Sequence, residues 1–179
     1  MSESSNTLTS VNIPYINLNE NDIKDKTLKR LFCEAKSAIV RLEIYELLSE
    51  LCSHEIKHDP TKPGLIITDK VQKQYRYLYK IASAIAGKIR GRVTITLPDG
   101  HIVVDTCKQE GNTYENYIDD VISENHNTRI CIFQAQYGDN GASYETKYSS
   151  TTYQREIYVA VRLGYSRNSI GTLRLSIPE

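Results

Sequence analysis

The segment HEIKH, from His54 to His58, places two histidines one helical turn apart, with a glutamate directly after the first. In this arrangement two imidazoles can bind zinc while the carboxylate activates a metal-bound water, which is the chemistry of zinc peptidases. Lys57 lies inside the segment, Pro60 follows it, and no Gly-x-x-His extension supplies a third ligand. We therefore interpret it as the polar end of a helix, where histidines suit the helix dipole, and keep a zinc peptidase and incidental metal binding as alternatives.

The sequence offers no other catalytic pattern. It has no Gly-x-Ser-x-Gly, the stretch AGKIRGR lacks the spacing of a phosphate-binding loop, and no Gly-x-Gly-x-x-Gly follows an apolar run. The basic stretch KIRGR is short, so we interpret it as a solvated helix end rather than a nucleic-acid contact. We predict a protein that is not an enzyme and has no cofactor, no metal site and no nucleic-acid partner.

Charge and cysteine content point to a protein of the cell interior. The chain has 179 residues, with 22 Lys+Arg and 22 Asp+Glu, so no overall field would attract it to nucleic acid or to an anionic membrane. The N-terminus lacks the regions of a signal peptide, and no apolar run approaches the ~18 residues of a membrane span. The cysteines form no Cys-x-x-Cys pair and lie in apolar patterns, which predicts buried free thiols in a soluble cytoplasmic protein. They are Cys33, Cys52, Cys107 and Cys131.

Two long helices are predicted after a polar arm of residues 1–21. Apolar residues recur at helical spacing from Asp22, a good N-cap, to about residue 56, where HDPTKPG ends the pattern. A second pattern starts near Thr68 and stops at Gly91. These stripes fit core-facing amphipathic helices, and the regular spacing of the second also fits a coiled-coil seam, so we predict a homodimer through these helices. The second stripe consists of Val71, Tyr75, Leu78, Ala82, Ile85 and Ile89.

Strand patterns follow the helices. Residues 92–106, RVTITLPDGHIVVDT, are two alternating runs joined by Pro98 and Gly100, which predicts a β-hairpin. SYETKYS, REIYVAVRL and GTLRLSIP predict three further strands, and GNTYENYIDDVIS predicts a short helix. TRICIFQAQYG fits either a strand or a helix that ends at Gly138. The predicted class is α+β, with an antiparallel sheet flanked by short helices.

The order of these motifs resembles the PAS-like, single-Cache sensor domains of bacterial receptor histidine kinases. The matching stretches are RVTITLPDGHIVVDT, ENHNTR, QAQYGDNG, KYSSTT, IYVAVRL and IGTLRLSIP, which span about Val71 to Pro178. The resemblance implies a sensor sheet that directly follows a long helix, and it gives Asp105 and Thr106 the role of anchoring the next loop. Where such domains have Arg-Pro-Glu, residues 129–131 read Arg-Ile-Cys. We see neither a membrane helix nor a kinase domain, so we expect a stand-alone module.

The resemblance also implies a ligand cavity between the sheet and residues 126–138. We predict that it holds a small polar or anionic molecule, because a guanidinium matches a carboxylate or phosphate and tyrosines supply apolar walls. Strand alternation directs Tyr158 and Arg162 to the same side. The predicted ligand-binding residues are His126, Arg129, Tyr144, Tyr158 and Arg162.

Three parts and one function are predicted. The parts are the arm (1–21), a helical region (22–91) and the PAS-like α+β domain (92–179). The predicted function is that of a non-enzymatic, sensor-like module that binds a small molecule. The alternatives are a structural or protein-interaction scaffold that reuses the fold and, third, a zinc peptidase through HEIKH.

Overall fold

The computed structural model describes residues 16–39, 44, 46–48, 69–98, 100, 102–108, 129–150, 152–164 and 169–179. In this part of the chain a five-stranded antiparallel sheet has the order β2-β1-β5-β4-β3. Helices accompany it, so the predicted α+β class is confirmed. The strands are β1 (Arg92–Thr96), β2 (Ile102–Asp105), β3 (Ala142–Ser149), β4 (Gln154–Leu163) and β5 (Gly171–Pro178). The helices are α2 (Lys26–Ile39), α4 (Asp69–Ile89) and α6 (Ile130–Tyr137), with the 3-10 turns η1 (Glu20–Asp22) and η2 (Thr106–Lys108).

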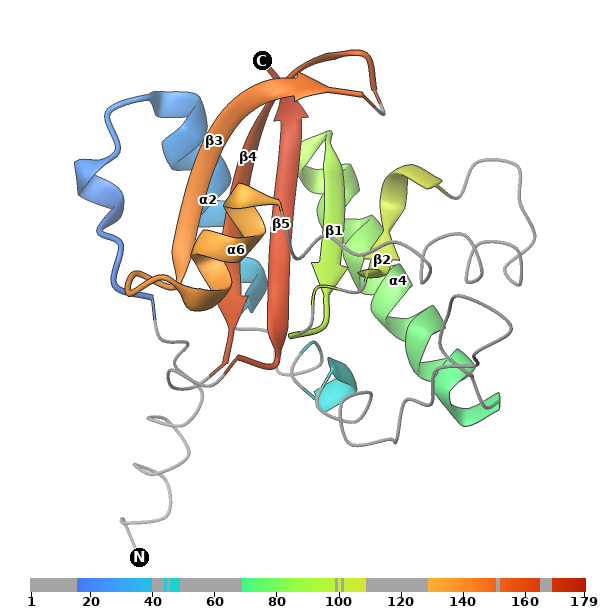
Figure 1. Cartoon of the computed structure of the whole chain (residues 1–179). Helices are drawn as coiled ribbons and strands as arrows, with labels where there is room; N and C mark the ends of the chain where they lie inside the picture. Colours follow the sequence, from blue (N-terminus) through green and yellow to red (C-terminus); the bar gives the residue numbers. More distant parts are fainter. Residues whose placement is uncertain are drawn as a thin grey trace, which may run out of the picture.

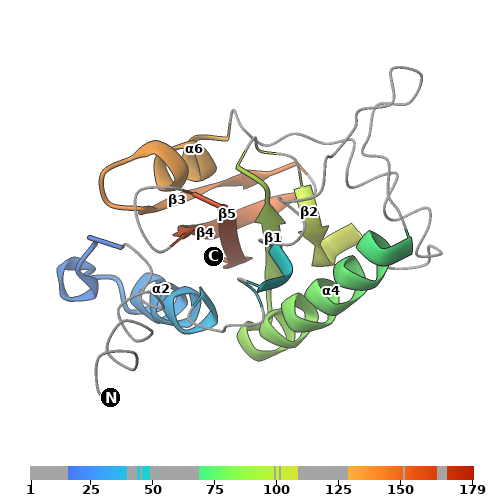
Figure 2. The same cartoon turned by 90° about the horizontal axis from the view of Figure 1, so that it is seen from below.

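The helices cover the two faces of the sheet (Figures 1 and 2). On one face α2 packs on β4 and β5, and α4 packs on β1 and β2. On the other face α6 packs on β3, β4 and β5. None of the described helices is long and apolar enough to cross a bilayer.

One apolar core joins the two long helices to the sheet. Phe32 of α2 and Leu78 of α4 are fully buried in it together with Val159 and Leu175 of the central strands. Ile44 and Leu48, which are helical, belong to the same core. The described helices and strands share this core across the boundary that we predicted between residues 91 and 92. That boundary stays a prediction.

The apolar stripe of α4 faces the sheet. Leu78, Ala82, Ile85 and Ile89 are all buried in the core, while Tyr77 is exposed. The side chains of the first two stripe residues lie outside the described set. The described part of this stripe is therefore buried within one chain and is not free to form the predicted dimer seam. A homodimer stays a prediction, and it would need a different surface.

The predicted hairpin is confirmed. The N–H of Gly100 donates to the carbonyl of Leu97 at 2.9 Å, and Gly100 has φ of 91°, which favours glycine. Beyond the turn, β1 pairs with β2 and with β5. Gly171, at the start of β5, lies so close to the carbonyl of Thr96 that a Cβ there would meet it at 2.2 Å.

The first helix starts later than we predicted. Asp22 lies in η1, and the carboxylate of Asp25 accepts the N–H of Leu28 at 2.8 Å, so Asp25 is the residue that caps α2. Asp22 and Asp25 are the same residue type, so either could cap a helix. Because Asp22 lies in the 3-10 turn η1, Asp25 caps α2. The remainder of the predicted helix is described only at residues up to 39, 44 and 46–48. HEIKH, Cys52, His126 and the predicted helix at GNTYENYIDDVIS lie outside the described residues.

Only one of the three described cysteines is buried as predicted. Cys131 is buried, and burial raises the pKa of its thiol to about 11. Cys33 is partly exposed and its Sγ donates to the Glu20 carboxylate at 3.1 Å. Cys107 is exposed in η2, because the chain leaves the sheet there, so the prediction was wrong for this residue.

Candidate functional site

Strand alternation gives the sheet two unlike faces. Val159 and Val161 of β4 lie in the main core, whereas Tyr158 and Ala160 pack with residues of α6. Cross-strand pairing extends this second surface, which we call the α6 face, over all five strands. It is polar and yet buried. Its buried polar or charged members are Arg92, Thr94, Thr96, Asp105, Ser143, Ser149, Glu156, Tyr158, Arg162, Thr172, Arg174 and Ser176.

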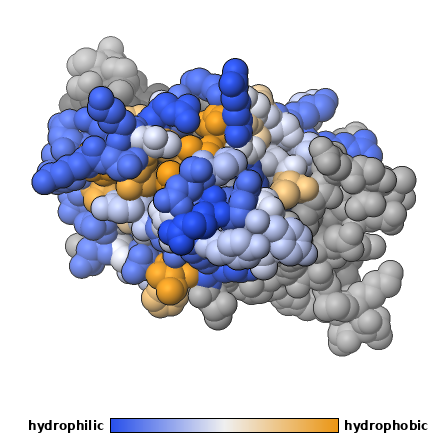
Figure 3. Space-filling model, turned by 90° about the horizontal axis from the view of Figure 1, so that it is seen from above, coloured by the Kyte–Doolittle hydropathy of each residue, from blue (hydrophilic) through white to orange (hydrophobic). Residues whose placement is uncertain are grey.

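The stretch TRICIFQAQYG, which fits a strand or a helix by its sequence, forms helix α6. Cys131 and Ala135 form a small apolar contact with the α6 face, and the N–H of Gly138 donates to the carbonyl of Gln134 at 2.8 Å, which ends the helix. The outer side of α6 is also apolar but exposed. Figure 3 shows hydrophobic atoms that protrude on the α6 side of the molecule. The exposed residues of this outer side are Ile130, Phe133 and Tyr137.

Gln136 fastens α6 to the sheet. Its side-chain amide nitrogen donates to the carbonyl of Pro98 in the hairpin turn, and its amide oxygen accepts from Thr172 Oγ1 at 2.9 Å. Arg162 Nη1 donates to the backbone carbonyl of Gln136 at 3.2 Å, which suits the negative end of a helix. These hydrogen bonds hold α6 at a fixed position against β4 and β5.

We expect Gln136→Leu to lower the free energy of unfolding by about 1–3 kcal/mol, because Thr172 would lose its acceptor and the Pro98 carbonyl would lose its closer donor. Gln134→Leu is the matched control, since Gln134 is exposed on the same helix. Urea denaturation followed by circular dichroism measures both variants. Equal losses in the two variants would contradict the role given to Gln136.

A buried ion pair lies at the β1–β2 side of the α6 face. Arg92 Nε and Nη2 donate to the two carboxylate oxygens of Asp105 at 2.8 and 2.5 Å. Burial by itself raises the pKa of Asp105, but the hydrogen bonds and charge of Arg92, helped by the N–H of Cys107, outweigh it and hold the pKa below its usual value. Cys107 N–H to Asp105 and Val93 N–H to Thr106 Oγ1 measure 3.1 and 3.0 Å. Asp105 thus holds the start of η2, and Thr106 links that turn to β1. Their predicted role of anchoring the next loop stays a prediction, because that loop lies outside the described residues.

Arg174 lies in the middle of this face and lacks such a partner. Its guanidinium is 5.0 Å from the ring centre of Tyr158, and the two residues are 4% and 3% exposed. None of the described residues accepts a hydrogen bond from it or forms an ion pair with it. Burial, and after it the charge of Arg92, lowers the pKa of Arg174. Lys147 Nζ also lies near the Tyr158 ring, 5.6 Å from its centre.

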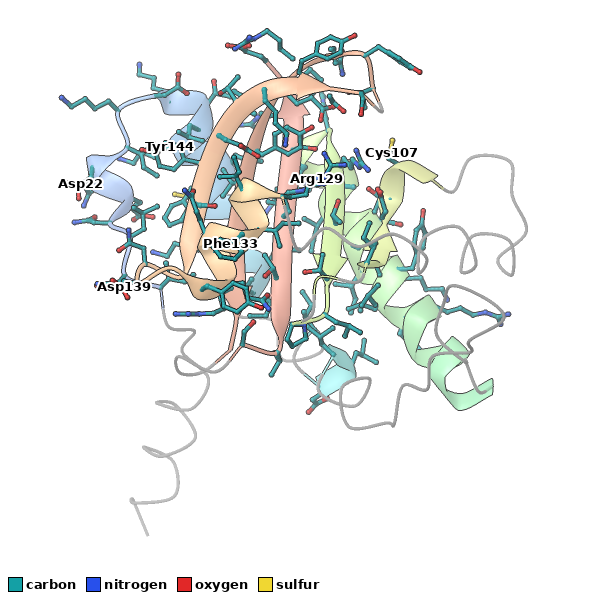
Figure 4. The ribbon with its side chains drawn as sticks, viewed as in Figure 1. Asp22, Cys107, Arg129, Phe133, Asp139 and Tyr144 are labelled. Atoms are coloured by element: carbon teal, nitrogen blue, oxygen red, sulfur yellow. The ribbon has the colours of Figure 1, made fainter. Side chains whose placement is uncertain are left out.

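The predicted binding residues are only partly brought together. Arg129 is exposed at the N-terminal end of α6 (Figure 4), and Tyr158 and Arg162 share the α6 face as alternation predicted. Tyr144 pairs with Val159, so it lies on the opposite face of the sheet and cannot line one site with Tyr158. His126 lies outside the described residues.

Sequence reasoning missed Arg174. The signal was present in the predicted strand GTLRLSIP, because Leu173 and Leu175 share one face of a strand and the residue between them is directed to the other. Whether that residue becomes buried depends on α6, which the strand pattern does not reveal. Among the described residues no three His, Cys, Asp or Glu side chains are grouped so that they could hold a metal ion.

Comparison with known proteins identifies the fold. No family model and no curated protein matches the chain. The sensor domain of the V. cholerae histidine kinase DctB is similar at a TM-score of 0.57 and 12% identity, over 83% of this chain and 49% of that one. The ligand-binding domain of the Campylobacter jejuni chemoreceptor Tlp3, solved with L-valine, gives a TM-score of 0.46 at 14% identity, over 89% of this chain and 62% of that one.

The predicted resemblance is confirmed at the level of the fold. The likeness to the DctB domain extends over 83% of this chain, and the chain spans about half the length of that domain. The likeness to the chemoreceptor is too weak to support an argument. A TM-score of 0.57 at 12% sequence identity shows a shared fold and leaves the ligand open.

Proposed function

We propose that the protein is a sensor-like module that binds a small anion on the α6 face, with Arg174 as its main charged contact. The observation that carries the proposal is the burial of Arg174 without a hydrogen-bond acceptor among the described residues. A buried charge without a partner costs several kcal/mol. Carboxylate or phosphate oxygens match the donor fork of a guanidinium and would offset that cost.

The surroundings of Arg174 suit an anion. The ring of Tyr158 provides an apolar wall beside it. Cys131, in the first turn of α6, packs against the same wall, so the positive end of the helix dipole lies over this part of the sheet. Arg129 would add a charge at the exposed rim. The fold shared with a histidine kinase sensor domain supports a binding role, and the proposal assigns no reaction to the protein.

A protein-interaction module is the second candidate. It is favoured by the exposed outer side of α6, where the rings of Phe133 and Tyr137 contact each other at a tilt of 54° with their centres 5.0 Å apart. A homodimer would use this surface more readily than the stripe of α4, which is buried. The cytoplasmic location stays a prediction.

A thermal-shift screen of carboxylates, phosphates and nucleotides tests the anion proposal. A ligand that binds the native state at about 100 times its Kd adds about 2.7 kcal/mol to the free energy of unfolding, which raises Tm by several degrees. We expect hits with the wild-type chain and none with Arg174→Met, which keeps the length of the side chain and removes its charge. Arg155→Gln is the control, because Arg155 is exposed on the same sheet.

Two results would contradict the proposal. One is a screen in which no anion raises the wild-type Tm. The other is a hit that raises the Tm of Arg174→Met as much as that of the wild type.

A further inference from the structure

The two edges of the sheet differ in length and regularity. β2, at one edge, has four residues, and the register of β1 against it shifts between Ile95 and Thr96. β3, at the other edge, has eight residues, contains no proline and pairs with β4 in one continuous register (Figure 1). Edge strands in native proteins are commonly short, bulged or covered, because their open backbone groups invite another strand. Among the described strands, β3 pairs with β4 alone, so its outer edge is open to such pairing.

Every second residue of β3 directs its backbone groups to this open edge. The N–H of Arg162 donates to the carbonyl of Gly141 at 2.7 Å, which continues the register beyond the pair of Ala142 and Val161. In an antiparallel ladder the residues that exchange hydrogen bonds with one neighbour alternate along the strand. The odd-numbered residues of β3 therefore bond to β4. The residues whose N–H and C=O groups point to the open edge are Ala142, Tyr144, Thr146 and Tyr148.

The sequence of β3 is complementary to its own reverse. Residues 143–149 read SYETKYS, with Thr146 at the centre. When two copies of this strand lie antiparallel with their Thr146 residues opposite each other, Tyr144 lies opposite the partner's Tyr148. Glu145 then lies opposite the partner's Lys147. All residues with edge-directed backbone groups meet one another in this register, so a regular ladder of hydrogen bonds can form.

The charges of β3 favour this register over its neighbours. Glu145 and Lys147 would occupy non-hydrogen-bonded positions, where opposite Cα atoms are about 4.5 Å apart and side chains are closest. An axis moved by one residue would place two copies of Glu145, or two copies of Lys147, directly opposite each other, which is destabilising. Lys147 Nζ already lies 3.4 Å from Glu145 Oε1 within one chain. The central register extends this ion pair into a network of four alternating charges.

We propose that the chain forms a homodimer by antiparallel pairing of its β3 strands, with the twofold axis at Thr146. Such pairing satisfies the open backbone groups of both copies and joins two five-stranded sheets into one. Tyr144 and Tyr148, which are 48% and 59% exposed, would gain apolar contacts with the partner on the face opposite α6. The proposed interface is separate from the outer side of α6, and it does not depend on the anion site.

Sedimentation velocity on the full chain tests the dimer with two complementary charge variants. Glu145→Lys would place lysines opposite each other across the axis, and Lys147→Glu would do the same with carboxylates. We expect the wild type to sediment as a dimer and each variant alone to dimerise at least about tenfold more weakly, which corresponds to about 1.4 kcal/mol. An equimolar mixture of the two variants should dimerise as tightly as the wild type, because opposite charges face each other again. Glu179→Lys, at an exposed glutamate outside β3, is the control and should leave the Kd unchanged.

Disulfide cross-linking tests the position of the axis. Thr146→Cys would place two thiols opposite each other with Cα atoms about 5.5 Å apart, which a disulfide can bridge. Tyr144→Cys would place them about 13 Å apart along the strand direction, which a disulfide cannot bridge. Mild oxidation should therefore give a covalent dimer of Thr146→Cys, and none of Tyr144→Cys or of the wild type, which controls for the exposed Cys107.

Three results would overturn the inference. The first is a wild-type chain that stays monomeric at every soluble concentration. The second is a dimer whose Kd neither charge variant changes, because the interface would then lie elsewhere. The third is cross-linking of Tyr144→Cys to the same extent as Thr146→Cys. Circular dichroism checks that each variant is folded, and cross-linking of Thr146→Cys decides where a charge variant is not.

Discussion

Replacing Asp105 by alanine is expected to lower the free energy of unfolding by about 3–5 kcal/mol, because the variant leaves the Arg92 guanidinium buried without its carboxylate. The two side chains are 0% and 10% exposed and share two hydrogen bonds. The substitution also removes the acceptor of the Cys107 N–H, which starts the next turn. Urea denaturation of the wild type and the variant measures the difference.

A surface ion pair of the same chemistry provides the control. Arg155 Nε donates to Glu179 Oε2 at 2.7 Å, and both side chains are largely exposed. Glu179→Ala should therefore cost less than about 1 kcal/mol. If Asp105→Ala costs no more than this control, the buried pair does not have the role given to it here.

The pH dependence of the same pair follows from the lowered pKa of Asp105. A carboxyl with a depressed pKa in the folded state contributes stability that is present above the unfolded value, about 3.9 for Asp, and is lost as pH falls through the folded value. The advantage of the wild type over Asp105→Ala should thus be constant near neutral pH and shrink below about pH 4. An advantage that grows on acidification would contradict the charged pair.

The second large effect is expected in α2. The chain has two phenylalanines, and Phe32 is 0% exposed in the core while Phe133 is 52% exposed on α6. Phe32→Ala should cost about 3–5 kcal/mol through lost burial and a cavity. Phe133→Ala is the matched control and should change stability by less than about 0.5 kcal/mol, as surface substitutions usually do.

The shape of the unfolding curve adds a second readout for Phe32→Ala. Because α2 shares one core with β4 and β5, the whole transition should shift to lower denaturant and remain single. A curve that splits into two steps, with only the first one displaced, would show that the helical region unfolds separately from the sheet.

The strands and their faces could be predicted because alternation is a local property. The register that aligns one strand with its neighbour is not a local property. Tyr144 and Tyr158 were each placed correctly within their own strands, but the register pairs Tyr144 with Val159, and a pairing shifted by one residue would have put the tyrosines together. That register is set by contacts across the sheet, which no single strand pattern contains.

The charged centre of the site could be predicted only in part for a similar reason. Arg174 and Glu156 lie in the predicted strands GTLRLSIP and REIYVAVRL, where they alternate with apolar residues, so the face to which they point could be read from the sequence. Their burial is a tertiary effect of α6 and of the neighbouring strands. Helix α6 itself was ambiguous, because its residues are apolar on both the inner and the outer side and thus show no helical periodicity.

The most direct test of the anion site is an NMR titration of the arginine side chains. The Nε–H signal of Arg174 is assigned by its loss in Arg174→Met, and the signal of Arg155 serves as the exposed reference. With the tightest anion from the thermal screen, we predict that the Arg174 signal shifts to saturation at the calorimetric Kd while the Arg155 signal stays in place. An anion that binds with the same Kd and leaves the Arg174 signal unchanged would contradict the account.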